Sequence, residues 1–133
     1  MRINQSTDYA IRMAVYLAQS ACPIPSSKLS EAIGVSPRYL LQIGSKLREG
    51  GLILVSYGPK GGYELSRKPE EITLLDIIQI MERRTGFLVY AASTGNLRKG
   101  LMLESVYCSI NAMVIGELEK VTLKSLLFDT RES

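Results

Sequence analysis

Residues Ser36–Ser66 read SPRYLLQIGSKLREGGLILVSYGPKGGYELS, and this stretch decides the fold. Ser36 followed by Pro37 predicts a helix that runs to about Glu49. A serine N-cap accepts an orphan backbone N–H, and proline at the first helical position loses no needed hydrogen bond. Gly50-Gly51 then ends the helix, because glycine tolerates the left-handed backbone of a helix stop. The face of this helix that is predicted to lie in the core consists of Leu40, Ile43 and Leu47.

Two β-strands are predicted to follow this helix. Leu52–Ser56 and Tyr63–Ser66 are expected to pair as an antiparallel hairpin, because their connection from Tyr57 to Gly62 is rich in residues that tolerate unusual backbone angles. Upstream, residues from about Ser27 to Ile33 predict a shorter helix that ends at Gly34. Two helices joined at a glycine turn and followed by a hairpin are the layout of a winged helix-turn-helix. That layout places one helix in a DNA groove and a loop on the neighbouring backbone.

An amphipathic helix is predicted before this motif, from Ser6 or Thr7 to about Gln19. Apolar residues recur there with the spacing of one helix face. They are Ala10, Met13, Ala14, Leu17 and Ala18. Pro23 and Pro25 end the helix because proline cannot continue it. Between them, Ile24 is expected to form a one-residue β-bridge to the hairpin.

The second half of the chain predicts a further helical region. Thr73 to Asp76 form a capping box, so a helix is expected to start there and to end near Arg83-Arg84. Residues 86–100 lack clear periodicity and predict a loop. A long helix is expected from Leu101 to about Lys120, and a short last helix from Leu123 to about Phe128.

The long helix carries an apolar stripe that a single winged helix has too little surface to cover. We expect a helix of a second subunit to cover it, which makes the protein a homodimer. The residues predicted at this contact are Leu103, Val106, Tyr107, Ile110, Met113, Val114 and Leu118. The fold is therefore predicted to be mainly α with a small β-hairpin. Residues 1–70 are assigned to DNA binding, and residues 71–133 to dimerisation and effector binding.

Composition narrows the class of protein further. The 133 residues suit one domain, or a small domain with an appendage. Apolar runs are short, and charges interrupt the start, where a cleavable signal would lie, so we expect a cytoplasmic protein without a membrane partner. Residues 1–66 carry seven Lys/Arg against four Asp/Glu, whereas residues 67–133 carry nine of each. The whole net charge of +3 thus lies in the first half, which favours a phosphate-facing surface there.

The helix from Pro37 to Glu49 is predicted to lie in the major groove. Arg38 suits guanine, because a guanidinium bonds O6 and N7 together, while Leu41 suits a thymine methyl and Gln42 suits adenine. The residues predicted to contact DNA, through bases or phosphates, are Ser27, Lys28, Ser36, Arg38, Tyr39, Leu41, Gln42, Ser45, Lys46, Tyr57, Lys60 and Gly61.

Several of these residues also have a plainer role. The charges of Arg38 and Lys46 are compatible with solvation alone, as is the polarity of Gln42 and Ser45. Tyr39 has the alternative role of packing its ring against the protein instead of contacting DNA. The glycines at the hairpin tip are also explained by the backbone angles that the turn requires.

Five stretches resemble a known family: MRINQSTDYAIRMAVYLA, SPRYLLQIGSKLREGGL, GPKGGYELSR, EITLLDIIQIME and VTLKSLL. In order and over nearly the whole chain, they are similar to the Rrf-two family of bacterial winged-helix transcription regulators, the IscR/NsrR/CymR group. The resemblance implies a homodimer that binds a palindromic operator in double-stranded DNA, most simply as a repressor. An enzyme is not expected, since the chain has no histidine, no nucleophile motif and no phosphate-binding glycine loop.

The chain departs from the family where some members sense their signal. Cluster-binding members have three cysteines before and at the start of the long helix, followed by a fourth ligand. Here Gly95 and Leu101 stand at two of those cysteine positions, and Glu104 stands near the fourth ligand. An iron–sulfur cluster normally needs several thiolates. We therefore predict no cofactor and no metal, and control by a small-molecule or protein effector.

Two alternatives stay open. The first is a thiol-redox switch through Cys108, although Cys108 on the apolar stripe is expected to be a buried small hydrophobe and Cys22 is expected to be structural. The second is an interaction module that docks a metabolic enzyme, which Leu41 and Tyr57 favour. Tyr57 stands where the resemblance implies an arginine before the wing-tip glycine. With Tyr57 there, the wing is expected to bind phosphates rather than enter a narrow minor groove.

Overall fold

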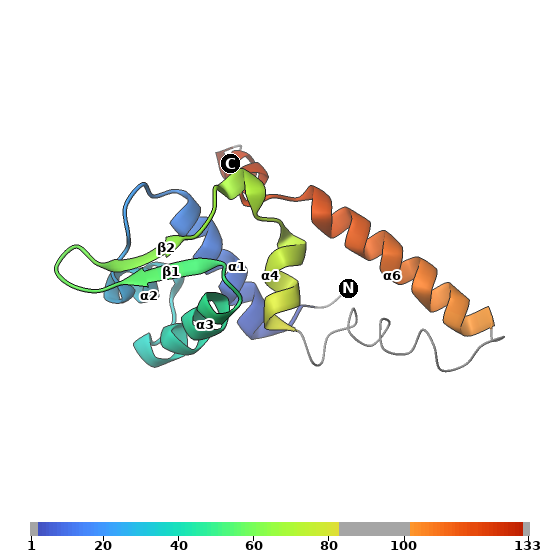
Figure 1. Cartoon of the computed structure of the whole chain (residues 1–133), viewed down its shortest axis with the longest axis horizontal. Coiled ribbons are helices and arrows are strands. Elements are labelled where there is room, and N and C mark those ends of the chain that lie inside the picture. Colours follow the sequence, from blue (N-terminus) through green and yellow to red (C-terminus); the bar gives the residue numbers. More distant parts are fainter. Residues whose placement is uncertain (1–2, 83–101, 132–133) are drawn as a thin grey trace.

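The computed structural model describes residues 3–82 and 102–131 (Figure 1). Its elements in chain order are α1 (Gln5–Ala18), α2 (Ser26–Ile33), α3 (Pro37–Glu49), β1 (Ile53–Ser56), β2 (Gly62–Leu65), the 3-10 helix η1 (Pro69–Glu71), α4 (Leu74–Met81), α6 (Met102–Lys120) and α7 (Leu123–Arg131). The helices α1 to α4 and the hairpin gather into one body, and α6 extends away from it. This mainly helical fold with a small hairpin confirms the predicted fold class. Within the described ranges, no helix is long and apolar enough to cross a membrane.

Local capping explains where the helices start. Ser36 Oγ accepts the Tyr39 N–H at 3.1 Å, with proline in the first turn of α3, as predicted. The capping box of α4 is also present, because Thr73 and Asp76 each bond the other's backbone N–H. The predicted start of α1 at Ser6 or Thr7 is wrong. Asn4 is the N-cap, since its Oδ1 accepts the Thr7 N–H at 3.1 Å, and α1 therefore begins earlier, at Gln5.

The hairpin is antiparallel, with a register from Ile53 opposite Leu65 to Ser56 opposite Gly62. The first strand begins one residue later than predicted, and the second lies one residue earlier than predicted. The β-bridge of Ile24 is confirmed. Ile24 and Tyr63 exchange both backbone hydrogen bonds, at 2.9 and 2.8 Å. The hairpin is therefore tied to the loop between α1 and α2.

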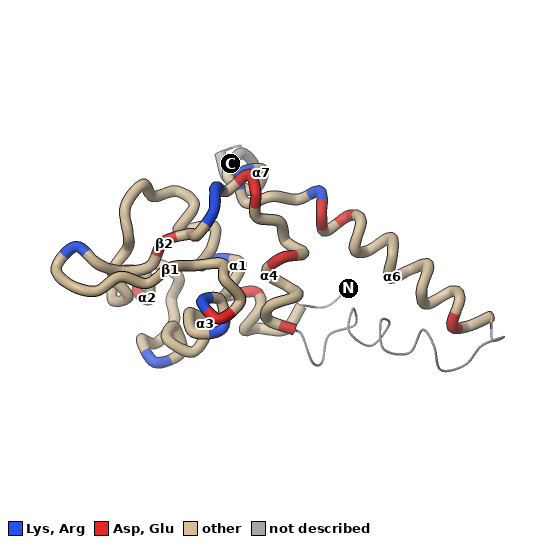
Figure 2. Tube along the Cα trace, in the orientation of Figure 1, with Lys and Arg blue, Asp and Glu red and all other residues tan. Residues whose placement is uncertain are grey.

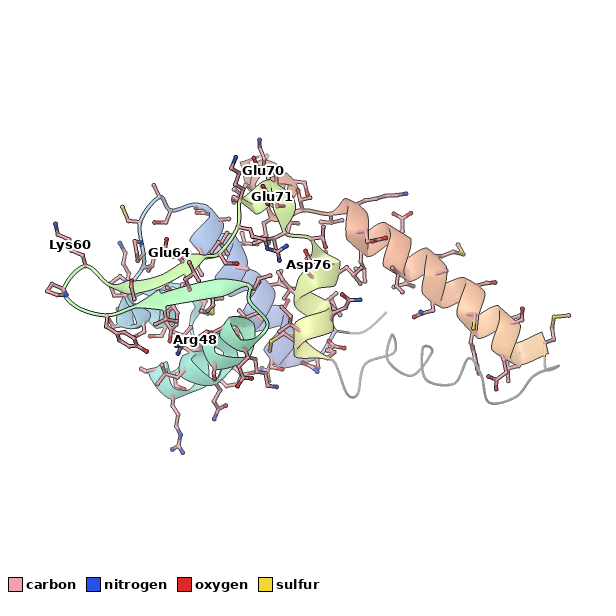
Figure 3. All side chains as sticks on the ribbon, viewed as in Figure 1. Arg48, Lys60, Glu64, Glu70, Glu71 and Asp76 are labelled. Atoms are coloured by element: carbon pink, nitrogen blue, oxygen red, sulfur yellow. The ribbon has the colours of Figure 1, made fainter. Side chains whose placement is uncertain are left out.

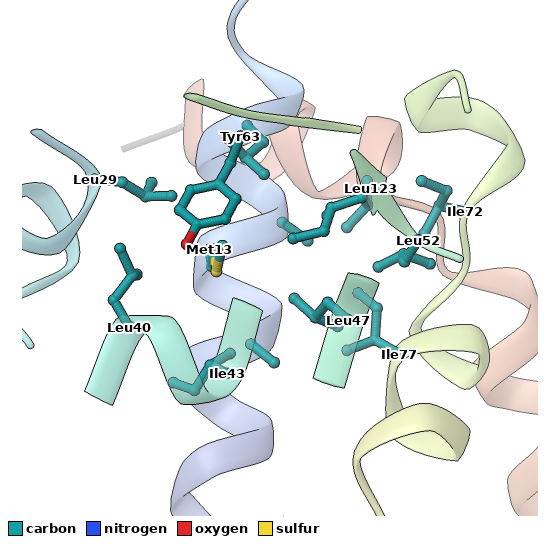
Figure 4. Close-up of a cluster of buried hydrophobic side chains, with 14 of the residues drawn as sticks. Met13, Leu29, Leu40, Ile43, Leu47, Leu52, Tyr63, Ile72, Ile77 and Leu123 are labelled. Atoms are coloured by element: carbon teal, nitrogen blue, oxygen red, sulfur yellow. The ribbon is translucent and has the colours of Figure 1, made fainter. Parts of the chain in front are cut away.

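The core forms around α1. Its buried members include Ala10, Met13, Ala14 and Leu17 of α1 and the predicted inner face of α3, Leu40, Ile43 and Leu47 (Figure 4). Four further members come from beyond residue 70: Met81, and Ile72, Ile77 and Leu123, which are each 0% exposed. The core of the winged helix thus extends past the predicted boundary between residues 70 and 71. The assignment of DNA binding to residues 1–70 and of dimerisation to residues 71–133 stays a prediction.

Among the described residues, the apolar contact of the long helix α6 with the body lies near its C-terminal end. Leu118 is buried there against Leu75 and Ile78 of α4, with Val114 packed beside them. The prediction that Leu118 lies on a face open to a second subunit is therefore wrong, because α4 of the same chain already covers it. On the rest of the stripe, Tyr107 is half-buried and four residues are exposed: Leu103, Val106, Ile110 and Met113.

Other boundaries also differ from expectation. Helix α4 ends at Met81, before the predicted end at Arg83-Arg84, and α7 runs to Arg131 instead of Phe128. Arg83, Arg84, Leu101 and the predicted loop 86–100 lie outside the described residues. Cys108 was expected to be buried, yet it is exposed, as is Cys22 in its loop. Cys108 lies in the N-terminal half of α6, two turns before Ile115, which packs against the α4 cluster.

Candidate nucleic-acid interface

The outward face of α3 is the centre of the candidate interface. Arg38, Leu41, Gln42, Ser45 and Lys46 are all exposed there, opposite the buried inner face of the same helix. Leu41 is 55% exposed, a large apolar side chain among polar neighbours. Spacings of three and four residues place these side chains along one side of the helix. This face can present a guanidinium fork, an amide and an apolar group to one partner at the same time.

The N-terminal turn of α3 is fixed by two contacts. Ser36 is exposed while its hydroxyl caps the helix. The Tyr39 ring meets the Tyr9 ring of α1 edge to face, with centroids 5.8 Å apart and planes at 90°. The packing role of Tyr39 is therefore present in the structure, and its hydroxyl remains a predicted phosphate contact. Because α1 is central to the core, this aromatic pair holds the start of α3 against the body.

The tip of the hairpin lies beyond the last strand pair. Tyr57 is 81% exposed, and Lys60 is exposed at the outer end of the hairpin (Figure 3). Gly61 has a backbone reason to be glycine, because a Cβ there would lie 2.4 Å from the Ser56 carbonyl oxygen. The Gly61 N–H also donates to the Gly58 carbonyl at 3.0 Å. Gly61 thus shapes the turn that presents Lys60.

The first turn of α2 provides unused backbone donors. Its N-cap is Pro25, which makes no side-chain capping bond, and Ser27 and Lys28 are exposed in this turn. The first N–H groups of a helix have no partner within the helix and attract anions. With the Lys28 ammonium beside them, these amides are suited to a phosphate oxygen.

Positive charge is unevenly spread over the molecule (Figure 2). Lys and Arg lie on α3 and at the wing tip, and also just before η1 and at the end of α6, whereas acidic residues lie on α4, η1 and α6 and at the end of α3. Arg12 adds little to this surface, because its Nε donates to Asp8 Oδ2 at 2.8 Å. That hydrogen bond and the Asp8 charge raise the pKa of Arg12. In the segment from Ser36 to Ser66, four Lys/Arg face two Glu, so the local balance is positive but small.

Sequence reasoning missed one residue of this region. Tyr63 of β2 lies directly behind the wing tip and is 6% exposed. Burial raises the pKa of Tyr63 above its ordinary value of 10.0, with a further contribution from Tyr57, while the nearby Arg48 guanidinium opposes it. The alternation of the strand would have placed Tyr63 on the inner side of the hairpin. No local pattern shows which helix its ring meets.

The donors of this chain do not fit an iron–sulfur cluster. Cys22 lies between α1 and α2, Cys108 lies on α6, and the sequence has no other cysteine and no histidine. Among the residues with described positions, no group of three or more His, Cys, Asp or Glu is placed to hold a metal ion. A thiolate-bound cluster requires several thiolates on one site, which two cysteines on separate elements do not provide.

Comparison with known proteins agrees with this architecture. The family model Rrf2, described as an iron-dependent transcriptional regulator, matches residues 3–129. The HTH-type transcriptional regulator IscR of Aliivibrio salmonicida is 37% identical over 84 residues, which cover 62% of this chain and 50% of that protein. This chain thus spans about half the length of that relative.

Solved structures show the same arrangement over nearly the whole chain. IscR of T. potens superposes with a TM-score of 0.80 at 27% identity, covering 99% of this chain and 90% of that one. CymR, the global cysteine regulator of B. subtilis, superposes with a TM-score of 0.77 at 25% identity, covering 95% of each chain. The hairpin behind α3 is therefore the wing of a winged helix, and the chain belongs to the Rrf2 family, whose model is described as a transcriptional regulator.

Proposed function

We propose that this protein is a homodimeric repressor that reads a palindromic operator through α3 and works without an iron–sulfur cluster. The observation that carries the proposal is the outward face of α3, where Arg38, Leu41 and Gln42 are exposed together. In winged helix-turn-helix proteins the second helix of the motif enters the major groove. We therefore call α3 the recognition helix.

Base reading would be divided among three side chains of the recognition helix. The Arg38 guanidinium bonds guanine O6 and N7, and the Gln42 amide bonds adenine N6 and N7. Leu41 contacts a thymine methyl, which is the only apolar group that the major-groove edges of the bases present. Ser45 follows one turn later and bonds a base or a phosphate.

Phosphate contacts would surround this base-reading face. Lys46 lies on the recognition helix, Ser36 lies at its start, and Ser27 with Lys28 begins α2. Lys60 brings a fifth contact from the wing tip, with Tyr57 and Gly61 shaping the tip around it. Such contacts fix register and orientation without reading sequence, and they make affinity depend on salt.

Dimerisation is proposed from the exposed apolar residues of α6. Met102 and Met113 are 78% and 71% exposed, and Val106 and Ile110 are 43% and 45% exposed. At about 1.5 Å per residue, the 19 residues of α6 make a rod roughly 28 Å long, most of it without cover from its own body. A two-fold partner covers this rod and sets two recognition helices about 34–36 Å apart, one DNA turn. Repression then follows from blocking polymerase at the operator.

Control without a cluster requires another signal. The shortage of thiolates supports control without thiolate ligation of the family type, so we assign control to a small-molecule or protein effector acting on residues 71–133. A second candidate signal is oxidation of Cys108, because its thiol is exposed on α6 beside the proposed dimer face. Replacing Cys108 by serine and comparing operator release under peroxide separates the two. An unchanged response eliminates the redox switch.

One experiment tests the whole proposal. The purified protein is used to select bound duplexes from a random library, and its mass is measured by sedimentation. We expect a dimer that enriches an inverted repeat whose half-sites are one DNA turn apart. A monomer, or a dimer that enriches no common sequence at low salt, contradicts the proposal. A dimer that captures a metabolic enzyme but no DNA would support the interaction module instead.

A further inference from the structure

Tyr63 connects three parts of the winged helix. Its backbone N–H and carbonyl pair with Ile24, at 2.8 and 2.9 Å, and so hold β2 against the loop before α2. Gly62 makes this approach possible, because a Cβ there would lie 2.3 Å from the Ile24 carbonyl oxygen. The Tyr63 side chain then extends to a third part, the recognition helix (Figure 4).

The ring of Tyr63 meets the recognition helix at Gly44. A Cβ added to Gly44 would lie 3.3 Å from Tyr63 Cε1, and 3.4 Å from both Cζ and Oη. The helix backbone and the ring are thus in direct contact, with no side chain between them. Glycine is the poorest residue for a helix interior apart from proline. Its presence in the middle of α3 has a local reason, since any larger residue pushes against this ring.

The contact lies between the two parts that are proposed to touch DNA. Gly44 is buried on the inner side of α3, next to Ser45 on its outer side. Tyr63 follows the last strand pair, Ser56 with Gly62, directly behind the tip that carries Lys60. The spacing between Lys60 and the outer face of α3 therefore depends on the distance between the Tyr63 ring and Gly44.

We infer that Tyr63 is a positioning residue for DNA binding: its contact with Gly44 sets the distance between the wing and the recognition helix. At that distance, Lys60 binds a phosphate while α3 lies in the neighbouring groove. The inference rests on the proposed function and names what aligns its two contact surfaces. A methyl group at position 44 would displace the ring from α3 by a few tenths of an ångström, which we expect to misalign Lys60 with its phosphate.

The test uses Gly44→Ala, Tyr63→Leu and Lys60→Ala, each on the full-length chain. Binding to a duplex selected by the wild-type protein is measured over a range of salt concentrations, and thermal unfolding is measured in parallel. Gly116→Ala is the control for helix propensity, because a Cβ at this helical glycine has no neighbour within 4 Å. Tyr63→Leu tests the same contact from the wing side and adds no volume to the helix.

We expect Gly44→Ala to remain folded and to bind about tenfold more weakly near 0.1 M salt, with the slope of log affinity against log salt reduced by about 0.9 for each subunit of the dimer. Those are the effects of losing one phosphate contact in each subunit, and Lys60→Ala alone should show the same two. Adding Lys60→Ala to Gly44→Ala should then weaken binding no further. Tyr63→Leu should likewise lower the salt slope.

Two results overturn the inference. One is a folded Gly44→Ala and a folded Tyr63→Leu that bind with the wild-type salt slope. The other is a double variant in which the losses from Gly44→Ala and Lys60→Ala multiply. Failure of the proposed function has a different signature, since Arg38→Ala would then also leave binding unchanged, and both proposals would fall together.

Discussion

The recognition helix α3 and the long helix α6 are both amphipathic, but their apolar faces are covered differently. The inner face of α3 is fully buried by its own chain, with Leu40 and Leu47 at 0% exposed. On α6, by contrast, Leu118 is buried near one end while Met113 stays 71% exposed one turn earlier. Periodicity shows which residues share a helix face and says nothing about what covers that face. The apolar face of α3 is covered by its own chain, whereas we propose that a second subunit covers the exposed apolar residues of α6.

The strongest test of this contrast is a charge on the uncovered face. Ile110→Asp should abolish the dimer and weaken operator binding by about a hundredfold or more, because the two recognition helices then bind independently. Sedimentation and operator titration measure both effects. Glu119→Asp, at an exposed position of α6, is the matched control and should behave like wild type. A dimeric Ile110→Asp variant would mean that another surface joins the subunits.

A second pair of variants compares covered and uncovered positions directly. Leu47→Ala should lower the free energy of unfolding by about 2–5 kcal/mol, since it leaves a cavity in the core. Met113→Ala should change the stability of the dilute monomer by less than about 0.5 kcal/mol, because its side chain is already in solvent. Denaturant unfolding at low protein concentration measures both values. Equal losses would contradict the difference between the two helices.

The outer face of α3 provides the third test. Arg38→Ala should weaken binding to the selected duplex by about 1–3 kcal/mol and relax preference at one base pair. Lys124→Ala is the matched control, as it removes one exposed cation from α7. Titration of duplexes with each base pair varied in turn would show the relaxed position. If both variants bind equally, Arg38 does not read a base.

The smallest expected effect on DNA binding belongs to Leu41. Replacing one thymine of the operator by deoxyuridine removes only the methyl group, and should cost the wild-type protein about 0.8 kcal/mol. The Leu41→Ala variant should bind the two duplexes equally, because the apolar partner of the methyl is gone. Anisotropy titration of the four combinations measures this coupling. A wild-type protein that is insensitive to every such replacement would remove Leu41 from the base-reading set.

Local signals were predicted well, and long-range packing was not. Ser36-Pro37 and Thr73 with Asp76 identify helix starts because each cap is completed within four residues. Asn4 was missed because Ser6 and Thr7 just after it are equally good capping residues. Leu118 was misplaced because its cover comes from α4, more than thirty residues away in the sequence.

The candidate site divides in the same way. The exposed face of α3 follows from helical spacing, so Arg38, Leu41 and Gln42 could be selected from sequence and lie together on that face. The contact of Tyr63 with Gly44 joins a strand to a helix and leaves no periodic trace in either. The exposure of Cys108 depends on how much of α6 lies against α4, and this too needs the tertiary structure.

The return of the chain after α6 has a consequence for anyone who wishes to move this DNA-binding region into another protein. Thr73 pairs with Thr122, and Leu123 packs beside Ile72 in the same core as α1. A graft that stopped at residue 70 would leave behind three side chains that are 0% exposed, Ile72, Ile77 and Leu123. Residues 1–70 therefore cannot be transferred alone. A transferred region must also include α4, which precedes α6 in the chain, and the start of α7, which follows it.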